Sequence, residues 1–255
     1  MTAGPDQDRP VALITGAARR IGRATARAFA RAGCDIVITY RTSAVEAADA
    51  KAELESLGAR VRLERLDLAD LDATIAAGAR LAGDLDRLDY LIHNASIYRA
   101  TALDELTADE ILTHYTVNAA GPLLLTAQLA PLLRASRAPG GGAVVCMCDI
   151  HAMGRPRTGF AAYAMSKAAL AEMVRSLARD LAPDVRVTGV APGVVAWPES
   201  GYESDREAQQ AYLSRVPLGR SGTPDDAAAT IRWLAMEATY VTGVVLPLDG
   251  GRRLA

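Results

Sequence analysis

The sequence predicts a doubly wound α/β fold: one domain built on a seven-stranded parallel sheet with helices on both faces. Three observations predict it. The length of 255 residues suits one hydrophobic core, and short apolar runs alternate with longer helical patterns along the chain. A glycine-containing turn joins the first apolar run to the first helical pattern, as expected where a parallel sheet binds a nucleotide.

The strands and helices of this Rossmann-type fold are expected to alternate, linked by right-handed crossovers. Residues 1–10 are expected to form a flexible segment ahead of one domain that covers residues 11–255. Apolar runs of strand length occupy residues 11–15, 35–40, 60–66, 88–93, 143–148, 185–191 and 244–248. Patterns of helical length occupy residues 20–32, 43–57, 71–82, 108–134, 161–181 and 224–236.

The connection at residues 194–214 is too long to be a routine one. It follows the sixth strand, and open α/β sheets bind ligands at the carboxyl ends of their strands. It contains Trp197, Pro198 and Gly201. We expect a lid over a substrate here, although Trp197 also suits a hydrophobic anchor for the loop.

Composition indicates a small-molecule partner. Half of the residues are hydrophobic and the net charge is −2, which gives no sign of a nucleic-acid-binding surface. The odd set of Cys34, Cys146 and Cys148 supports neither a disulfide framework nor a zinc site. Residues 1–10 do not resemble a secretory signal, so a cytoplasmic protein is expected. Residues 115–133 are uncharged but contain two prolines, which favours a buried helix over a membrane span.

The turn after the first strand has the features of a pyrophosphate site. Gly16 and Gly22 allow a tight turn and a close approach of the backbone, and the free amides of the helix start, near Ile21, supply positive potential. Arg20 stands where a third glycine is common. It could reach the pyrophosphate or a polar substrate group, or lie in solvent.

The end of the second strand predicts the choice of dinucleotide. An acidic residue there would accept hydrogen bonds from an adenosine ribose, but this chain has Arg41, Thr42 and Ser43. A guanidinium and two hydroxyls suit a 2′-phosphate, which favours NADPH over NADH. After the third strand, Asp67 could accept a hydrogen bond from an adenine amino group, and a helix cap near Asp70 explains this segment almost as well.

A tyrosine and a lysine in the fifth helical pattern suggest acid/base chemistry. Tyr163 and Lys167 are four residues apart, so their side chains share one face of the helix. A fixed cation beside a phenol favours the ionised form and would lower the pKa of the phenol. The pair is a candidate proton-transfer unit, although the spacing alone also occurs on ordinary surface helices.

These motifs in this order resemble the short-chain dehydrogenase/reductase family, over residues 11–251. The resemblance implies an NADPH-binding reductase in which Asn94 and Ala95 line the adenosine side and Asn118 holds a water beside Lys167. It further implies that Tyr163 transfers the proton and that Pro192 and Gly193 precede the substrate lid. A homotetramer is also implied, with the helices at 108–134 and 161–181 forming one interface.

Two departures from the common family pattern resemble the pteridine reductase branch. Arg20 replaces a glycine, and Asp149 replaces the serine that follows the fifth strand. This resemblance implies that Arg20 lies near the cofactor phosphates and the pterin, and that Tyr98 covers the pterin ring. Tyr98 could equally be a core aromatic, and Ser96 could contact the cofactor, frame the substrate or cap a turn.

The expected reaction is NADPH-dependent reduction of a pterin, dihydropterin or dihydrofolate C=N bond. Reduction of C=N also requires a proton on nitrogen, and Asp149 beside Tyr163 would supply a second protonatable group. Activity is therefore expected to be favoured on the acidic side of neutrality. The alternatives are a carbonyl reductase acting on a 3-oxoacyl thioester or small ketone, and a cofactor-binding regulator without turnover.

Overall fold

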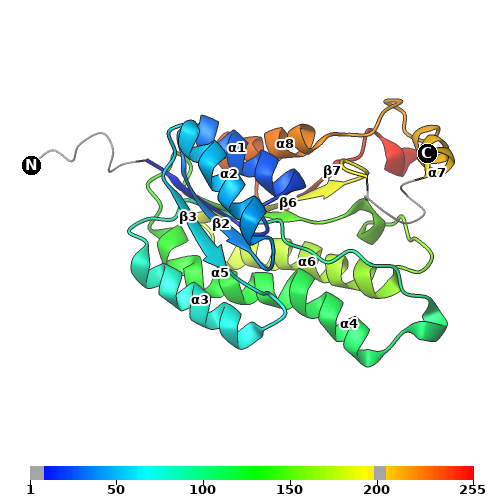
Figure 1. The fold of residues 1–255 in the computed structure, drawn as a ribbon, viewed down its shortest axis with the longest axis horizontal. Helices are drawn as coiled ribbons and strands as arrows, with labels where there is room; N and C mark the ends of the chain where they lie inside the picture. The colour runs from blue at the N-terminus through cyan, green and yellow to red at the C-terminus, as the bar shows by residue number, and fades with distance from the viewer. Residues whose placement is uncertain (1–8, 198–204) are drawn as a thin grey trace, which may run out of the picture.

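The computed structural model describes residues 9–197 and 205–255 and has the expected architecture. Seven parallel strands form one sheet in the order β3-β2-β1-β4-β5-β6-β7 (Figure 1). The neighbours β1 and β4 mark the point where the winding reverses, so a crevice opens beyond their carboxyl ends. The strands are β1 (Val11–Ile14), β2 (Asp35–Tyr40), β3 (Val61–Arg65), β4 (Tyr90–His93), β5 (Gly142–Met147), β6 (Val185–Pro192) and β7 (Val245–Leu248).

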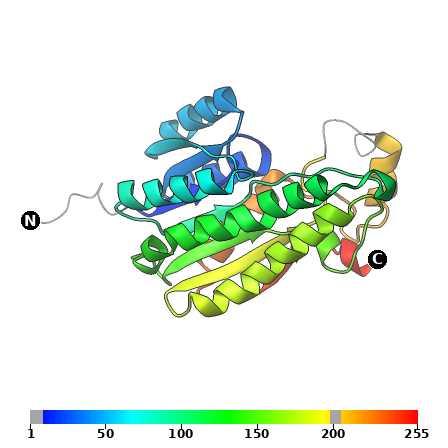
Figure 2. The ribbon, with the colours of Figure 1, turned by 90° about the horizontal axis from the view of Figure 1, so that it is seen from below.

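The helices form a layer on each face of the sheet. One layer contains α1, α2 and α8, and the other contains α3, α5 and α6, which lie side by side with α4 at their end (Figures 1 and 2). Their bounds are α1 (Arg20–Arg31), α2 (Ala44–Ser56), α3 (Leu71–Asp84), α4 (Ala108–Tyr115), α5 (Gly121–Arg134), α6 (Ala161–Asp180), α7 (Arg206–Leu213) and α8 (Pro224–Met236). Short 3-10 turns are η1 (Leu103–Glu105), η3 (Ile150–Ala152) and η5 (Arg252–Leu254).

Two hydrophobic cores lie between the sheet and these layers, because successive side chains of a strand point to opposite faces. Leu13 packs with the α3, α5 and α6 layer, and its neighbour Ile14 packs with the α1, α2 and α8 layer. The first core also contains Leu91, Leu125, Leu129, Val144, Leu170 and Val174. The second also contains Phe29, Ile36, Leu54, Ile92, Ile231 and Leu234.

The helix expected at residues 108–134 consists of three parts. One π-helical turn, η2 (Thr116–Ala120), separates α4 from α5. In the described part of the chain, residues 108–134 form the one helix long and apolar enough to cross a membrane. In this fold, however, 56% of its apolar stretch is buried. Its contacts with α3 and α6 are those of a core helix, as the sequence predicted.

Several connections differ from expectation. The fifth strand, expected at residues 143–148, begins one residue earlier at Gly142 and ends at Met147. Within the proposed lid, α7 is a helix that the sequence did not suggest, and residues 198–204 with Pro198 and Gly201 lie outside the described residues. Residues 1–8 of the expected flexible segment also lie outside them, whereas Arg9 donates to the carbonyls of Gly33 and Gly58.

The carboxyl end of α8 is fixed by a side chain from the neighbouring β6. The guanidinium of buried Arg186 donates to the carbonyl oxygens of Leu234 and Ala235 at 2.7 Å and of Ala238 at 3.1 Å. It satisfies carbonyls that the last turn of a helix leaves free. This end of the domain, opposite the crevice, is therefore held rigidly.

Candidate active site

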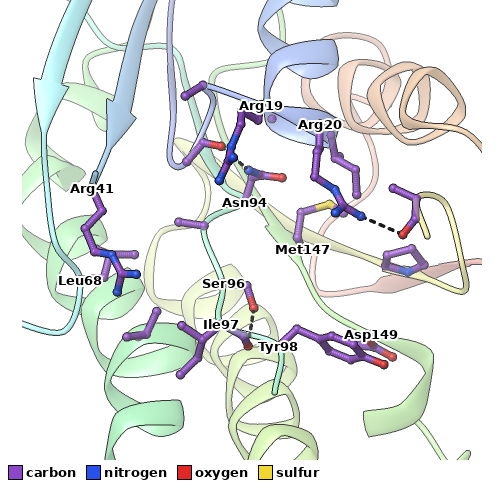
Figure 3. Close-up of a pocket in the computed structure, with 18 of the residues that line it drawn as sticks. Arg19, Arg20, Arg41, Leu68, Asn94, Ser96, Ile97, Tyr98, Met147 and Asp149 are labelled. Carbon is purple, nitrogen blue, oxygen red and sulfur yellow. Dashed lines mark hydrogen bonds between the residues drawn. The ribbon is translucent and has the colours of Figure 1, made fainter. Parts of the chain in front are cut away.

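A cleft of about 660 Å³ lies along the carboxyl ends of the strands. Figure 3 shows Arg41 at one side of it and Tyr98 with Asp149 at the other. The cleft gathers residues from the loops after β1 to β6, and almost every residue predicted for the site lines it. Those residues are Gly16, Arg20, Ile21, Gly22, Arg41, Thr42, Ser43, Asp67, Asn94, Ala95, Ser96, Tyr98, Asp149, Tyr163, Lys167, Pro192 and Gly193.

The turn after β1 is a main-chain cradle that only glycine fits. Gly16 has a φ of +65°, in the left-handed region that favours glycine. A Cβ on Gly22 would lie 2.5 Å from the carbonyl oxygen of Gly16 and 2.6 Å from Nδ2 of Asn94. Asn94 itself donates to the carbonyls of Thr15 and Gly16, at 2.9 and 3.2 Å. Arg20, Ile21 and Gly22 of the first turn of α1 line the cleft, where a pyrophosphate could meet the free amides of a helix start.

The end of β2 presents basic and hydroxyl groups to the same cleft. Arg41, Thr42 and Ser43 line it, and so does Arg19, whose guanidinium is 3.3 Å from the carboxylate of Glu46. Sequence analysis missed Arg19, although its place in the glycine turn was a usable signal. This group of donors suits a phosphate on the adenosine ribose.

After β3, Asp67 and Asp70 have different surroundings, and both explanations offered for this segment apply, each to a different residue. Asp70 caps α3, because its carboxylate accepts from the amide of Ala73. Asp67 lines the cleft, and one of its oxygens accepts from the amide of Ala69 at 3.0 Å. Asp67 is therefore placed where it could meet an adenine, and the cap is a separate residue.

Asn118 ties three elements together behind the cleft without lining it. Its Oδ1 accepts from the Ser96 hydroxyl at 2.9 Å and from the amide of Ile97 at 3.0 Å. Its Nδ2 donates to the carbonyl of Ile97 and to the Ser166 hydroxyl. The side chain thus positions the loop after β4 against α6, while its predicted part in a water relay remains a prediction.

The phenol of Tyr163 and the carboxylate of Asp149 converge at the end of the cleft. The Tyr163 hydroxyl donates to Oδ2 of Asp149 at 2.7 Å, and Oδ1 of Asp149 accepts from the amide of His151. The ammonium of Lys167 donates to the carbonyl of Met147 at 2.7 Å, and its nitrogen is 5.9 Å from the centre of the Tyr163 ring. An acid, a phenol and a cation therefore share one corner of the cleft.

The electrostatics of this corner correct one expectation. Lys167 was expected to lower the pKa of Tyr163, but burial raises that pKa well above its ordinary value, and the charge of Asp149 and the hydrogen bond to it raise it further. Burial also lowers the pKa of Lys167, opposed by the nearby Cys148 and Asp149. Tyr163 is therefore a neutral phenol that can give a proton, rather than a phenolate.

Aromatic rings surround Tyr163. The ring of Tyr98 stacks on Phe160 with centroids 4.8 Å apart and meets Tyr163 edge-on at 4.9 Å. Arg157 donates to the Tyr98 hydroxyl at 2.6 Å and lies 4.6 Å above the Phe160 ring. Tyr98 keeps 42% of its surface exposed, so it is part of the wall of the cleft and not of the core. The sequence did not indicate Phe160 or Arg157.

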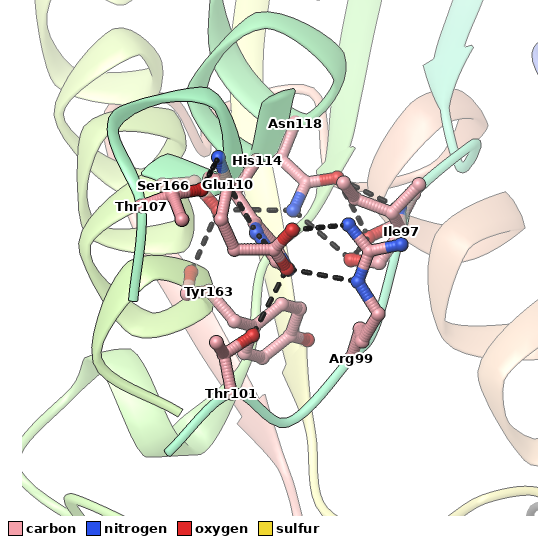
Figure 4. A network of polar contacts seen from close by, with 10 residues as sticks. Ile97, Arg99, Thr101, Thr107, Glu110, His114, Asn118, Tyr163 and Ser166 are labelled. Atoms are coloured by element: carbon pink, nitrogen blue, oxygen red, sulfur yellow. Dashed lines mark hydrogen bonds and ion pairs between the residues drawn. The ribbon is translucent and has the colours of Figure 1, made fainter. Parts of the chain in front are cut away.

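Behind Tyr163, a polar network joins α4 to the loop after β4 (Figure 4). Glu110 accepts from Arg99 at 2.8 Å and from Thr101 at 3.0 Å, and the hydrogen bond to Arg99 lowers the pKa of Glu110. The buried ring of His114 donates through Nδ1 to the Glu110 carbonyl at 3.0 Å, because a carbonyl can only accept. The network fixes the segment that carries Tyr98.

Two predicted site residues contact the loop after β6 and its surroundings. The side chain of Arg20 donates to the carbonyls of Ala196 and Trp197 in the loop after β6, both at 3.0 Å. Trp197 does not line the cleft; its ring meets Tyr212 edge-on at 5.5 Å, in agreement with an anchoring role. His151 is half-buried and also lines the cleft.

The described residues contain no group of His, Cys, Asp or Glu side chains suited to a metal, and all three cysteines are buried and free. The cleft does fit a dinucleotide. The glycine cradle would hold a pyrophosphate, Arg19 and Arg41 a further phosphate, and Lys167 the ribose next to the reacting end. This corner can then deliver a proton beside a hydride donor.

Known proteins resemble this chain over almost its whole length. A family model described as enoyl-(acyl carrier protein) reductase matches residues 16–253. The 3-oxoacyl-[acyl-carrier-protein] reductase FabG of Thermotoga maritima is 34% identical over 244 residues, which cover 94% of this chain and 96% of the relative.

Solved structures agree. A short-chain dehydrogenase from Burkholderia cenocepacia in complex with NADP superimposes with a TM-score of 0.87 at 35% identity, covering 96% of this chain and 98% of the other. A blue fluorescent protein from a metagenomic library, in complex with NADPH, gives a TM-score of 0.86 at 32% identity, covering 95% and 97%.

Proposed function

Because the chain belongs to the short-chain dehydrogenase/reductase family and is an NAD(P)-dependent oxidoreductase, we propose that it catalyses the NADPH-dependent reduction of a carbonyl group. The substrate is a 3-oxoacyl thioester or a small ketone. The observation that carries the proposal is the Tyr163 hydroxyl, which donates to Asp149 at 2.7 Å at the end of a dinucleotide-sized cleft. A regulator without turnover would need no proton donor there.

The preference for NADPH rests on the end of β2. Arg41, Thr42 and Ser43 line the cleft, and none of these three residues directly after the strand is acidic. Two structural neighbours contain NADP or NADPH, which supports the same choice.

In the proposed mechanism each residue has a separate task. The reduced nicotinamide supplies the hydride when it is bound. Tyr163 Oη gives its proton to the oxygen of the substrate, and the raised pKa keeps that proton available across neutral pH. Lys167, held by the Met147 carbonyl, places a cation beside the phenol and limits the charge that builds up there. Asn118 holds the loop after β4 in place.

One observation favours a second candidate substrate, the C=N bond of a dihydropterin or dihydrofolate. The carboxyl group of Asp149 accepts a hydrogen bond of 2.7 Å from the Tyr163 hydroxyl. A carboxyl group can itself carry a proton to a ring nitrogen. The exposed ring of Tyr98 would cover such a planar substrate. The name of the Thermotoga maritima relative, a 3-oxoacyl-[acyl-carrier-protein] reductase, favours the carbonyl substrate instead.

Turnover separates the two candidates. NADPH oxidation is followed with acetoacetyl-coenzyme A and a panel of small ketones, and in parallel with dihydrobiopterin, dihydromonapterin and dihydrofolate. We expect turnover of the carbonyl compounds. Turnover of dihydropterins alone would replace the first candidate with the second. In that case Asp149→Ser should reduce pterin turnover, and an undiminished rate would exclude a proton-transfer role for the carboxyl group.

A homotetramer belongs to the same proposal. Large apolar side chains remain exposed on the face formed by α4, α5 and α6, and others on α8 and around β7. Two such surfaces would allow each subunit to contact more than one neighbour. The first surface contains Leu112, Tyr115, Leu123 and Met165, and the second contains Trp233, Tyr240, Val244 and Leu246.

A further inference from the structure

Arg20 has a backbone conformation that its side chain makes costly. Its φ is 52°, and within the described part of the chain it is the one residue other than glycine with a positive φ. A Cβ in this left-handed region approaches the carbonyl oxygen, which is why glycine is preferred there. A residue that pays this cost needs a compensating contact.

The compensating contact spans the cleft. Nη2 of Arg20 donates to the carbonyl oxygens of both Ala196 and Trp197, each at 3.0 Å. Arg20 belongs to the turn after β1, whereas the two carbonyls belong to the loop after β6, more than 170 residues later in the chain. In Figure 3 the guanidinium extends from its helix toward this loop, and Arg20 also lines the cleft.

The loop at residues 193–197, which we name the β6 loop, is fixed at its start by other contacts. Val194 donates through its amide to the Tyr212 hydroxyl at 3.2 Å, and its carbonyl accepts from the amide of Gly222 at 3.0 Å. Trp197 packs edge-on against Tyr212. Arg20 is therefore the contact that attaches the outer end of this loop to the nucleotide side of the cleft.

The adjacent Arg19 provides a comparison within the same turn. Its φ of −143° is extended backbone that any residue adopts, and its guanidinium faces Glu46 of α2, on the adenosine side. Two neighbouring arginines thus point to opposite parts of the cleft. One is placed to meet a phosphate, and the other holds a loop.

We propose that Arg20 is a positioning residue: it holds the β6 loop over the substrate end of the cleft and so couples that loop to the dinucleotide turn. Only the expected change in the KM for the substrate rests on the proposed function. Because the guanidinium joins the two binding regions, cofactor bound at the turn will change the affinity for substrate, and substrate under the loop will change the affinity for cofactor by the same factor.

The test compares Arg20→Gly and Arg20→Lys with the matched control Arg19→Gly. Glycine accepts a φ of 52°, so Arg20→Gly removes the contact without adding strain. Hydrogen exchange of peptides covering residues 193–197 and the NADPH dissociation constant are measured for each variant. Neither measurement requires a known substrate, so both remain valid if the proposed reaction is wrong.

We expect Arg20→Gly to speed exchange in the β6 loop by roughly fivefold to thirtyfold, since both lost hydrogen bonds are exposed to solvent and together stabilise the loop less than buried ones would, and to leave NADPH affinity within about threefold. KM for the substrate should rise more than kcat falls. Arg20→Lys should restore part of the protection, because an ammonium still donates. Arg19→Gly should weaken NADPH binding and leave exchange of the β6 loop unchanged.

The opposite pattern would overturn the proposal. If Arg20→Gly leaves exchange of residues 193–197 unchanged and weakens NADPH binding by about tenfold or more, Arg20 serves the cofactor phosphates, as the sequence suggested. Unchanged exchange together with unchanged NADPH binding would also overturn it, since the contact would then have no effect on either region.

Discussion

The two ends of the cleft differ in the groups that form them, which are main-chain groups at one end and side chains at the other. At the nucleotide end the main chain makes the site: Gly16 and Gly22 shape the turn, and Asn94 holds it through backbone carbonyls. At the substrate end side chains make the site: Tyr163 binds Asp149, and Tyr98 stacks on Phe160. The first end tolerates no added atom, whereas the second tolerates changes of side chain that alter its chemistry.

This difference teaches how such a protein can keep its cofactor while its substrate changes. A backbone cradle depends on φ angles and on the absence of a Cβ, so substitutions there damage binding outright. A set of side chains can be altered one residue at a time without disturbing the sheet below it. The following variants test the difference, from the largest expected effect to the smallest.

Tyr163→Phe should show that the substrate end supplies chemistry and not cofactor binding. It removes the proton donor and keeps the ring that packs against Tyr98 and Phe160. We expect kcat to fall by about 10²- to 10⁴-fold. NADPH affinity, measured by fluorescence titration, should change little. A large loss of NADPH affinity would mean that the two ends are not separable in this way.

Gly22→Ala should break the nucleotide end. The new Cβ would meet the Gly16 carbonyl at 2.5 Å, which is backbone and cannot move aside cheaply. We expect a loss of about 1–3 kcal/mol in the free energy of unfolding, and little remaining NADPH affinity. Gly33→Ala is a control, since Gly33 has open space around its Cβ position but also a φ of +90°. Its melting temperature should fall with NADPH affinity retained, and equal NADPH losses in both variants would contradict the cradle.

Arg41→Ala changes a side chain at the nucleotide end, where the main chain forms most of the site. It therefore tests what a side chain contributes there. Loss of a charge-assisted contact to a 2′-phosphate should weaken NADPH binding by about tenfold to a hundredfold, and NADH kinetics should stay unchanged. The measurement is kcat/KM with each cofactor. Equal losses with NADPH and NADH would show that Arg41 serves the fold or a part of the cofactor that both share.

Asp149→Asn tests the electrostatics of the substrate end. The carboxylate is one cause of the raised pKa of Tyr163, so its removal should lower that pKa. Reduction needs the phenol form, and the rate is lost as pH rises through this pKa. In the unaltered protein the alkaline limb of kcat should therefore lie above the ordinary tyrosine range, and in the variant it should move to lower pH. An unmoved limb would show that burial alone raises the pKa.

The sequence predicted the sheet, its helices and most of the cleft, because those features follow from local patterns. Tyr163 and Lys167 share a helix face by spacing, and Gly16 and Gly22 mark a turn by position. The destination of the Arg20 side chain could not be predicted, since its partners are main-chain carbonyls of a distant loop.

The raised pKa of Tyr163 likewise depends on features that spacing does not show. Spacing placed Lys167 beside the phenol, yet its ammonium is held by the Met147 carbonyl, and burial decides the sign of the shift. The π turn at Thr116–Ala120 has no marker in the sequence that we recognised. Such features arise from packing between segments, which periodicity does not describe.

The burial of Lys167 makes the protein unusually easy to follow by covalent chemistry. Lys51 and Lys167 are the only lysines in the sequence. Lys51 keeps 40% of its side chain exposed on α2, whereas Lys167 is 3% exposed and anchored to a strand carbonyl. An amine-selective label should therefore react at Lys51 while the domain is folded and reach Lys167 only when its corner of the molecule opens. The ratio of the two adducts reports directly on the integrity of the catalytic corner.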